Sequence, residues 1–183
     1  MLADVIGVRR LSPDDWAIWR VLRLAALAEA PYAFGSQLAD WQGEGDREDR
    51  WRSRLSIPGS YNVVAMLDDQ LVGMASGVPT ADDGVVELIS MWVAPTARGR
   101  GVGDALVREV ERWGRDVGAR VLRLDVADDN RAASGLYERN GFGYTGEQGE
   151  LMPDGMRRER VMAKELRPLS TEAPENIATC GGT

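Results

Sequence analysis

The sequence predicts one α/β domain built on a mixed β-sheet, and three observations support this fold class. The chain has 183 residues, of which 44% are hydrophobic, and this is enough for the core of a single domain. Its apolar pattern alternates between helical and strand periods in the order helix, helix, three strands, helix, strand, helix, two strands. The first strands follow one another as hairpins and helices separate the later ones, so antiparallel and parallel pairs are both expected.

Two helices are expected before the first strands. Ser12 can cap the first helix, Pro13 suits its first turn, and apolar residues then recur at helical spacing up to Pro31. A second, highly charged helix is expected over residues 46–55, and residues 33–45 between the two helices are typical of a loop.

Strands occupy the middle of the chain. Residues 61–68 and 70–78 flank a turn-forming Asp-Asp pair and predict a hairpin, and a third strand covers residues 85–93. A helix is then expected over residues 101–117, because the helical pattern stops at Gly118.

The last part of the chain continues with a strand over residues 120–128, a short helix capped by Asn130, and two strands, of which the second covers residues 157–166. We therefore expect the domain to span residues 1–167. Residues 168–183 are rich in Pro, Ser, Thr, Glu and Gly and poor in apolar residues, which predicts a disordered tail.

The composition excludes several classes of site. There is no histidine and the only cysteine is Cys180, which removes histidine-based triads and histidine- or thiolate-ligated zinc, so no metal site is expected. The formal net charge of −7 disfavours a nucleic-acid partner. The first residues lack the apolar run of a signal peptide and no stretch is long enough to span a bilayer, so we expect a cytoplasmic protein without a membrane partner.

A glycine-rich loop follows the strand at residues 85–93. Its spacing fails the Walker A and G-x-G-x-x-G templates, whereas Arg98, Gly101 and Gly103 match R-x-x-G-x-G. Free N–H groups at a helix start, glycines that expose the backbone, and the charges of Arg98 and Arg100 suit a pyrophosphate. By itself the motif leaves a loop with solvated arginines as an open alternative.

Two motifs together resemble the GNAT superfamily of N-acetyltransferases. The first is R-x-x-G-x-G after the strand "ELISMWV", and the second is N-x-x-A-x-x-L-Y-x-x-x-G-F in the later helix. The second motif is formed by Asn130, Ala133, Leu136, Tyr137, Gly141 and Phe142. The order of the elements also fits this family from about residue 8 to residue 166.

The resemblance implies a mostly antiparallel sheet of about six to seven strands with about four helices, splayed between two central parallel strands at residues 85–93 and 120–127. It implies acetyl-CoA as the co-substrate, with the pantetheine arm along residues 91–93 and the diphosphate at residues 98–103. The cofactor-binding residues expected on this basis are Met91, Trp92, Val93, Arg98, Gly99, Arg100, Gly101, Val102, Gly103, Asn130, Ala133 and Tyr137.

The resemblance further implies direct attack of a primary amine, from a small molecule or a peptide, on the thioester in a ternary complex. It is also compatible with a homodimer. Tyr137 matches the general-acid position, where a phenol with a pKa of about 10 can protonate the departing thiolate. The alternative for Tyr137 is packing of its helix against the sheet, and the alternative function is a non-catalytic acyl-CoA-binding regulatory module.

Glu87 is the candidate general base. Two-residue alternation places it on the face shared by Ile89, Met91 and Val93, with Ser90 on the opposite face and without a catalytic role. A carboxylate among apolar neighbours has a raised pKa that suits it to accept a proton, whereas a carboxylate facing solvent or a salt bridge is the alternative. The resemblance makes the backbone N–H of Val93, or of a neighbouring residue, the donor to the oxyanion.

The resemblance places the acceptor amine between the loop after the first helix and the late hairpin at residues 146–156. The candidate acceptor-binding residues are Glu29, Tyr32, Phe34 and Ser36. Aromatic rings beside carboxylates can hold a cation, although such rings also serve as core residues and such carboxylates are often solvated.

Overall fold

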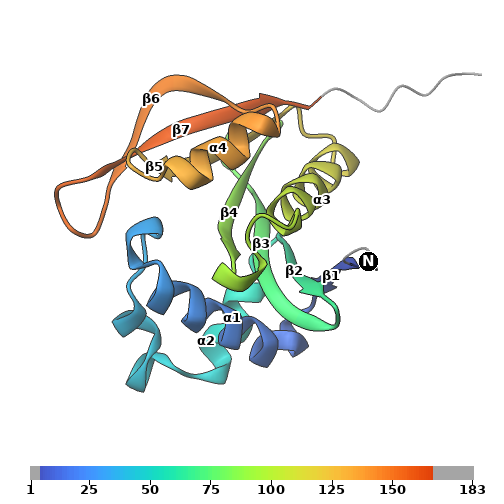
Figure 1. Cartoon of the computed structure of the whole chain (residues 1–183), viewed down its shortest axis with the longest axis vertical. Helices are drawn as coiled ribbons and strands as arrows, with labels where there is room; N and C mark the ends of the chain where they lie inside the picture. Colours follow the sequence, from blue (N-terminus) through green and yellow to red (C-terminus); the bar gives the residue numbers. More distant parts are fainter. Residues whose placement is uncertain (1–4, 167–183) are drawn as a thin grey trace, which may run out of the picture.

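A seven-stranded sheet forms the centre of the protein, whose computed structural model describes residues 5–166 (Figure 1). The strands lie in the order β1-β2-β3-β4-β5-β7-β6 across the sheet. They are β1 (Ile6–Leu11), β2 (Tyr61–Leu67), β3 (Gln70–Pro79), β4 (Val85–Val93), β5 (Val121–Ala127), β6 (Gly143–Leu151) and β7 (Arg158–Glu165). The α-helices of this part of the chain are α1 (Trp16–Glu29), α2 (Glu48–Leu55), α3 (Val102–Asp116) and α4 (Arg131–Arg139).

Helices cover both faces of the sheet and bury two cores. On one face, α3 and α4 pack over a core that includes Leu106 and Val110 from α3 and Met162 from β7. On the other face, α1 and α2 pack over a core that includes Trp19 and Trp51. Because β4 lies in the middle of the sheet, an opening beside this strand is enclosed by helices from both layers.

The parallel pair formed by β4 and β5 ends early. β4 pairs with β5 only over residues 85–87, opposite residues 121–123, whereas β5 stays paired with β7 along its whole length. Beyond Glu87 the two strands diverge, and β4 runs toward α1 while β5, β6 and β7 turn away (Figure 1). The predicted splay is therefore confirmed, and it leaves the β5-facing backbone groups of β4 without a ladder partner.

Most predicted elements are confirmed with small shifts of their ends. Asp68 and Asp69 both have positive φ angles, 49° and 64°, as a tight two-residue hairpin turn requires. α3 begins after Gly101 and ends before Gly118, and both glycines adopt the left-handed conformation. The side chain of Asn130 caps α4 by accepting a hydrogen bond from its first turn.

Two features differ from the predictions. β1 was missed: it pairs only with β2, and Gly7 and the two arginines that follow break its apolar pattern. The predicted loop contains two short 3-10 segments, Leu38–Trp41 and Gly43–Gly45, and a third, Pro31–Ala33, leads into it. The predicted tail at residues 168–183 lies outside the described residues. Within residues 5–166, no helix combines the length and apolar character that crossing a membrane requires.

Candidate active site

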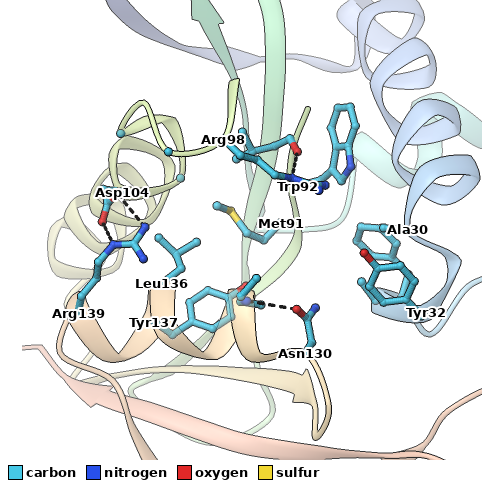
Figure 2. Close-up of a pocket in the computed structure, with 18 residues that line it drawn as sticks. Ala30, Tyr32, Met91, Trp92, Arg98, Asp104, Asn130, Leu136, Tyr137 and Arg139 are labelled. Atoms are coloured by element: carbon cyan, nitrogen blue, oxygen red, sulfur yellow. Dashed lines mark hydrogen bonds and ion pairs between the residues drawn. The ribbon is translucent and has the colours of Figure 1, made fainter. Parts of the chain in front are cut away.

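A cavity of about 640 Å³, which we call the first cavity, lies beside the end of β4 and is lined also by the starts of α3 and α4 (Figure 2). Ten predicted cofactor-binding residues line it: Met91, Trp92, Val93, Arg98, Gly99, Gly101, Gly103, Asn130, Ala133 and Tyr137. The side chains of Arg100 and Val102 do not. Val102 is only 1% exposed and packs in the core, and Arg100 lies 3.6 Å from Asp68. Most of the residues predicted to bind the cofactor therefore line the first cavity, whereas the side chains of Arg100 and Val102 point elsewhere.

The glycine-rich loop presents bare backbone to the first cavity. Gly99 and Gly101 have φ angles of 76° and 85°, in the left-handed region that favours glycine. No side chain caps α3, so the N–H groups of its first turn remain available to an anion. A Cβ atom at Gly103 would lie 3.1 Å from Leu136, so glycine allows α3 to approach α4 closely.

A carboxylate also lies at this helix start, but it is paired. Asp104 accepts hydrogen bonds from Arg139 at 2.9 and 3.1 Å (Figure 2). It also accepts one from Asn140 at 2.8 Å. The hydrogen bond from Arg139 is the main cause of the lowered pKa of Asp104. The negative charge of Asp104 is therefore balanced, and it does not oppose an anion at the start of α3.

The guanidinium of Arg98 is already engaged at the end of β4. It donates to the carbonyl of Val93 at 3.0 Å and to Glu29 Oε2 at 2.7 Å, and Trp92 Nε1 donates to the same Glu29 oxygen at 3.0 Å. Burial opposes ionisation of Glu29, but the hydrogen bonds from Arg98 and Trp92 outweigh it and hold the pKa of Glu29 below its usual value. Glu29 thus ties α1 to the glycine-rich loop, instead of facing an acceptor as predicted.

A β-bulge at Ser90 breaks the alternation of β4. Ser90 has a φ angle of 54°, and the register of β4 against β3 shifts at this point. Met91 and Val93 therefore pack against the core under α3 and α4, while Ser90 accepts a hydrogen bond from Arg54 of α2 at 3.1 Å. The predicted faces were wrong, because the bulge brings Ser90 to the side of Glu87 and turns Met91 and Val93 away from it.

A second cavity, of about 360 Å³, lies beside the first on the α1 and α2 side of the sheet. Ser36 and Glu87 line the second cavity, and Tyr32 lines the first. Phe34 and Tyr137 line both, together with Ala33 and Met91. The two cavities therefore meet at Tyr137, and three of the four predicted acceptor-binding residues line one cavity or both.

Tyr137 packs in the core and also lines both cavities. Its side chain is 6% exposed and packs edge-on against Phe142, with ring centroids 5.9 Å apart. It also borders both cavities, and it lies beside Met91 and Leu136 in Figure 2. Burial raises the pKa of Tyr137, so its phenol stays protonated at neutral pH and can donate a proton to a group in either cavity.

The chain matches one family model over well over half of its length. Residues 6–142 match the model described as the Acetyltransferase (GNAT) family. The chain belongs to the GNAT acetyltransferase family. Both sequence motifs lie within the matched residues, as do the splayed strand pair and Tyr137.

Named proteins are similar to this GNAT chain. It is 34% identical over 106 residues to N-acetyltransferase 8B of Homo sapiens. The aligned region covers 56% of this chain and 47% of that protein. It is also 27% identical over 154 residues to an aminoglycoside N(6′)-acetyltransferase type 1 of Stenotrophomonas maltophilia. This aligned region covers 79% of this chain and 91% of the Stenotrophomonas protein. The chain thus spans about half the length of its human relative.

The fold is also shared with solved structures. A putative acetyltransferase from Salmonella typhimurium, solved with acetyl-CoA, superimposes with a TM-score of 0.71 at 20% identity, over 93% of this chain and 99% of that one. At this identity the likeness establishes the fold, and the residues of the site have to be argued from this chain itself.

Three carboxylates form an acidic wall of the second cavity in this GNAT chain: Glu87 on β4, Asp125 on β5 and Glu159 on β7. Burial and then the charge of Asp125 raise the pKa of Glu87 above its ordinary value. Burial, followed by the charges of Asp125, Glu150 and Glu87, raises the pKa of Glu159 to about 7. Asp125 and Glu159 were missed in the sequence, because nothing local shows that their strands turn these faces toward Glu87.

We expect Glu159→Gln to stabilise the protein more at high pH than at low pH. The folded-state pKa of Glu159 is about 7, against an ordinary value of 4.5, so the folded protein binds this proton more tightly than the unfolded chain. The stabilisation that this tighter proton binding gives to the folded protein is fully present below the ordinary pKa of 4.5. It is lost as the pH rises through the folded-state pKa. The Tm gained by the variant over the wild type should therefore be larger at about pH 8 than at about pH 5.

The matched control is Glu165→Gln, which removes an exposed carboxylate from the same strand. Its Tm relative to the wild type should change less between these two pH values than the relative Tm of Glu159→Gln. If the Tm difference of Glu159→Gln depended on pH no more than that of this control, the acidic wall would not destabilise the folded protein at high pH.

Proposed function

We propose that the protein transfers the acetyl group of acetyl-CoA to a primary amine of a small molecule or a peptide. The observation that carries this proposal is the meeting of two cavities at Tyr137, one beside the open edge of β4 and the start of α3, the other lined by ionisable side chains. Direct transfer needs both reactants held side by side, and this arrangement suits it. Membership of the GNAT family and the similar fold solved with acetyl-CoA support the proposal.

The walls of the first cavity fit acetyl-CoA, which would supply the acetyl thioester. The β5-facing backbone groups of β4 near Met91 and Val93 are free of a sheet ladder and can pair with the amides of a pantetheine arm. The uncapped N–H groups beside Gly101 and Gly103 suit the diphosphate, and the pairing of Asp104 with Arg139 leaves no unbalanced negative charge in the same wall.

Two side chains of the protein would handle the protons. Glu87 lines the second cavity, and its raised pKa suits it to accept a proton from the acceptor ammonium, directly or through water. Tyr137 would donate its proton to the departing thiolate sulfur at the junction of the cavities. The backbone N–H of Val93, at the end of the open edge of β4, is the proposed donor to the oxygen on which charge develops.

Glu87→Gln is expected to lower kcat at neutral pH by about tenfold or more, and by less at high pH. The wild-type carboxylate is the base above its raised pKa, whereas the variant depends on the fraction of the amine that has already lost its proton. The measurement is kcat against pH, from about pH 6 to about pH 10. Glu138→Gln, exposed on α4, is the matched control. A constant ratio of wild-type to variant rates across this range would leave Glu87 with a structural role only.

The proposed function is tested by release of free thiol from acetyl-CoA over a panel of primary amines that includes amino acids, polyamines, aminoglycosides and lysine peptides. We expect at least one class to release thiol in proportion to the acetylated amine. Tight binding of acetyl-CoA without thiol release from any amine would refute the proposed function and favour a regulatory acyl-CoA-binding module.

A further inference from the structure

An arginine of the second cavity has a buried group without a partner. Arg23 on α1 is 8% exposed, and its Nη1 atom finds no hydrogen-bond partner among the described residues. The guanidinium lies over the ring of Phe34, 4.6 Å from the ring centroid. Burial, followed by the nearby charge of Arg54, lowers the pKa of Arg23 to about 10, but the group stays charged at neutral pH.

A second, half-buried arginine lines the same cavity. Arg54 on α2 donates hydrogen bonds of 3.1 to 3.2 Å to uncharged side chains, namely Asn62, Ser76 and Ser90. It also lies over the ring of Trp19, 5.1 Å from the centroid. Burial lowers the pKa of Arg54 to about 10 as well. Neither arginine takes part in a salt bridge within residues 5–166.

A buried guanidinium group beside a half-buried one, both without a counter-charge, is costly for the folded protein. An anion in the second cavity would remove this cost, because the planar fork of a guanidinium binds a carboxylate through two parallel hydrogen bonds. Arg23 Nη1 is the unused donor that such an anion would satisfy.

The opposite wall of the same cavity carries negative charge that is poorly compensated. Asp125 Oδ1 is buried without a hydrogen-bond partner among the described residues, and it lies on the acidic wall with Glu87 and Glu159. The salt bridge between Arg123 and Glu87 spans 4.0 Å, so it compensates little of the negative charge there. An ammonium group would neutralise negative charge on this wall, just as a carboxylate would neutralise the positive charge of Arg23 and Arg54.

We propose that the second cavity binds a small zwitterion, a primary amine that also carries a carboxylate, such as an amino acid or an amino-acid conjugate. Its carboxylate contacts Arg23 and Arg54, and its amino group faces the acidic wall and Tyr137. A volume of about 360 Å³ is suited to a molecule of this size. The inference rests on the proposed function for the fate of the amine, and it adds the class of the acceptor. The same arginines would repel polycationic amines.

The first test compares matched acceptors. Each amino acid is assayed beside the amine that lacks its carboxylate, for example phenylalanine beside phenethylamine and lysine beside cadaverine. We expect kcat/KM to be at least about tenfold higher for the members that carry the carboxylate. Aminoalkyl phosphates form a third set of acceptors. A higher kcat/KM for these than for the amino acids would overturn the assignment of a carboxylate, because the arginines would then bind a phosphate. Equal or faster reaction of the amines without an anion would overturn the proposal.

The second test uses Arg23→Met, which keeps an apolar stem and removes the buried charge. The KM for the amino acid should rise by at least about tenfold, the KM for acetyl-CoA should stay the same, and the Tm should be unchanged or higher. A lower Tm with an unchanged KM for the amino acid would make Arg23 a structural residue and overturn the proposal. Arg108→Met, at an exposed position on α3, is the matched control.

Binding without turnover separates this inference from the proposed function. We expect the common amino acids to raise the Tm of the wild-type protein and not that of Arg23→Met. Should Arg23→Met not fold, Arg23→Lys keeps the charge without the planar fork, and it should weaken this stabilisation. Stabilisation by amino acids without thiol release would refute acetyl transfer but support the zwitterion site. Thiol release from amines without any effect of a carboxylate would refute the zwitterion site alone.

Discussion

Tyr137→Phe should lower kcat for acetyl transfer by more than about tenfold while the affinity for coenzyme A persists. The hydroxyl is the only group that the substitution removes, and the ring can keep its edge-on contact with Phe142. Because burial raises the pKa of Tyr137, the wild-type phenol remains a proton donor well above neutral pH. The variant is therefore expected to be slower at every pH at which the protein stays folded, in contrast to Glu87→Gln.

The measurement is thiol release under saturating acetyl-CoA, with coenzyme A affinity from titration calorimetry. Tyr144→Phe is the matched control, because Tyr144 donates a 2.8 Å hydrogen bond to Ser134 and lines neither cavity. An unchanged kcat in Tyr137→Phe would leave Tyr137 as a packing residue of α4, and another group would have to protonate the thiolate.

The features that the sequence predicts well depend on local backbone requirements. Gly99 and Gly101 need left-handed φ angles, and Asn130 caps the helix that carries Tyr137, so both motifs are visible in short stretches of sequence. The splay of β4 from β5 followed from the resemblance and not from the residue pattern, because neither strand differs locally from a fully paired one.

The features that the sequence does not predict join residues far apart in the chain. The bulge at Ser90 arises from the register of β4 against β3, so alternation within β4 alone gives the wrong faces. Glu29 and Arg98 are 69 residues apart, and only the fold reveals their ion pair. Arg23 lies at a helical position where apolar residues are expected, and only the fold shows that it lines one cavity together with Arg54.

The second large effect is expected at the start of α3, where Gly103→Glu should weaken coenzyme A binding by about a hundredfold or more, equivalent to about 2.7 kcal/mol. A side chain at this position would begin 3.1 Å from Leu136 and 3.7 Å from Met91, both of which line the first cavity. Its carboxylate would compete with the diphosphate for the free N–H groups of α3 and repel its charge.

The fold should tolerate Gly103→Glu, because an acidic residue in the first turn of a helix is favourable and the contacting atoms are ends of flexible side chains. Calorimetric titration with coenzyme A measures the loss, and circular dichroism with the Tm verifies folding. Gly135→Glu adds the same charge to a helical glycine with open space around it and outside both cavities, so it should retain full affinity. If Gly103→Glu bound coenzyme A as tightly as Gly135→Glu, the diphosphate could not lie against the start of α3. The glycine-rich loop would then serve only the close packing of α3 against α4.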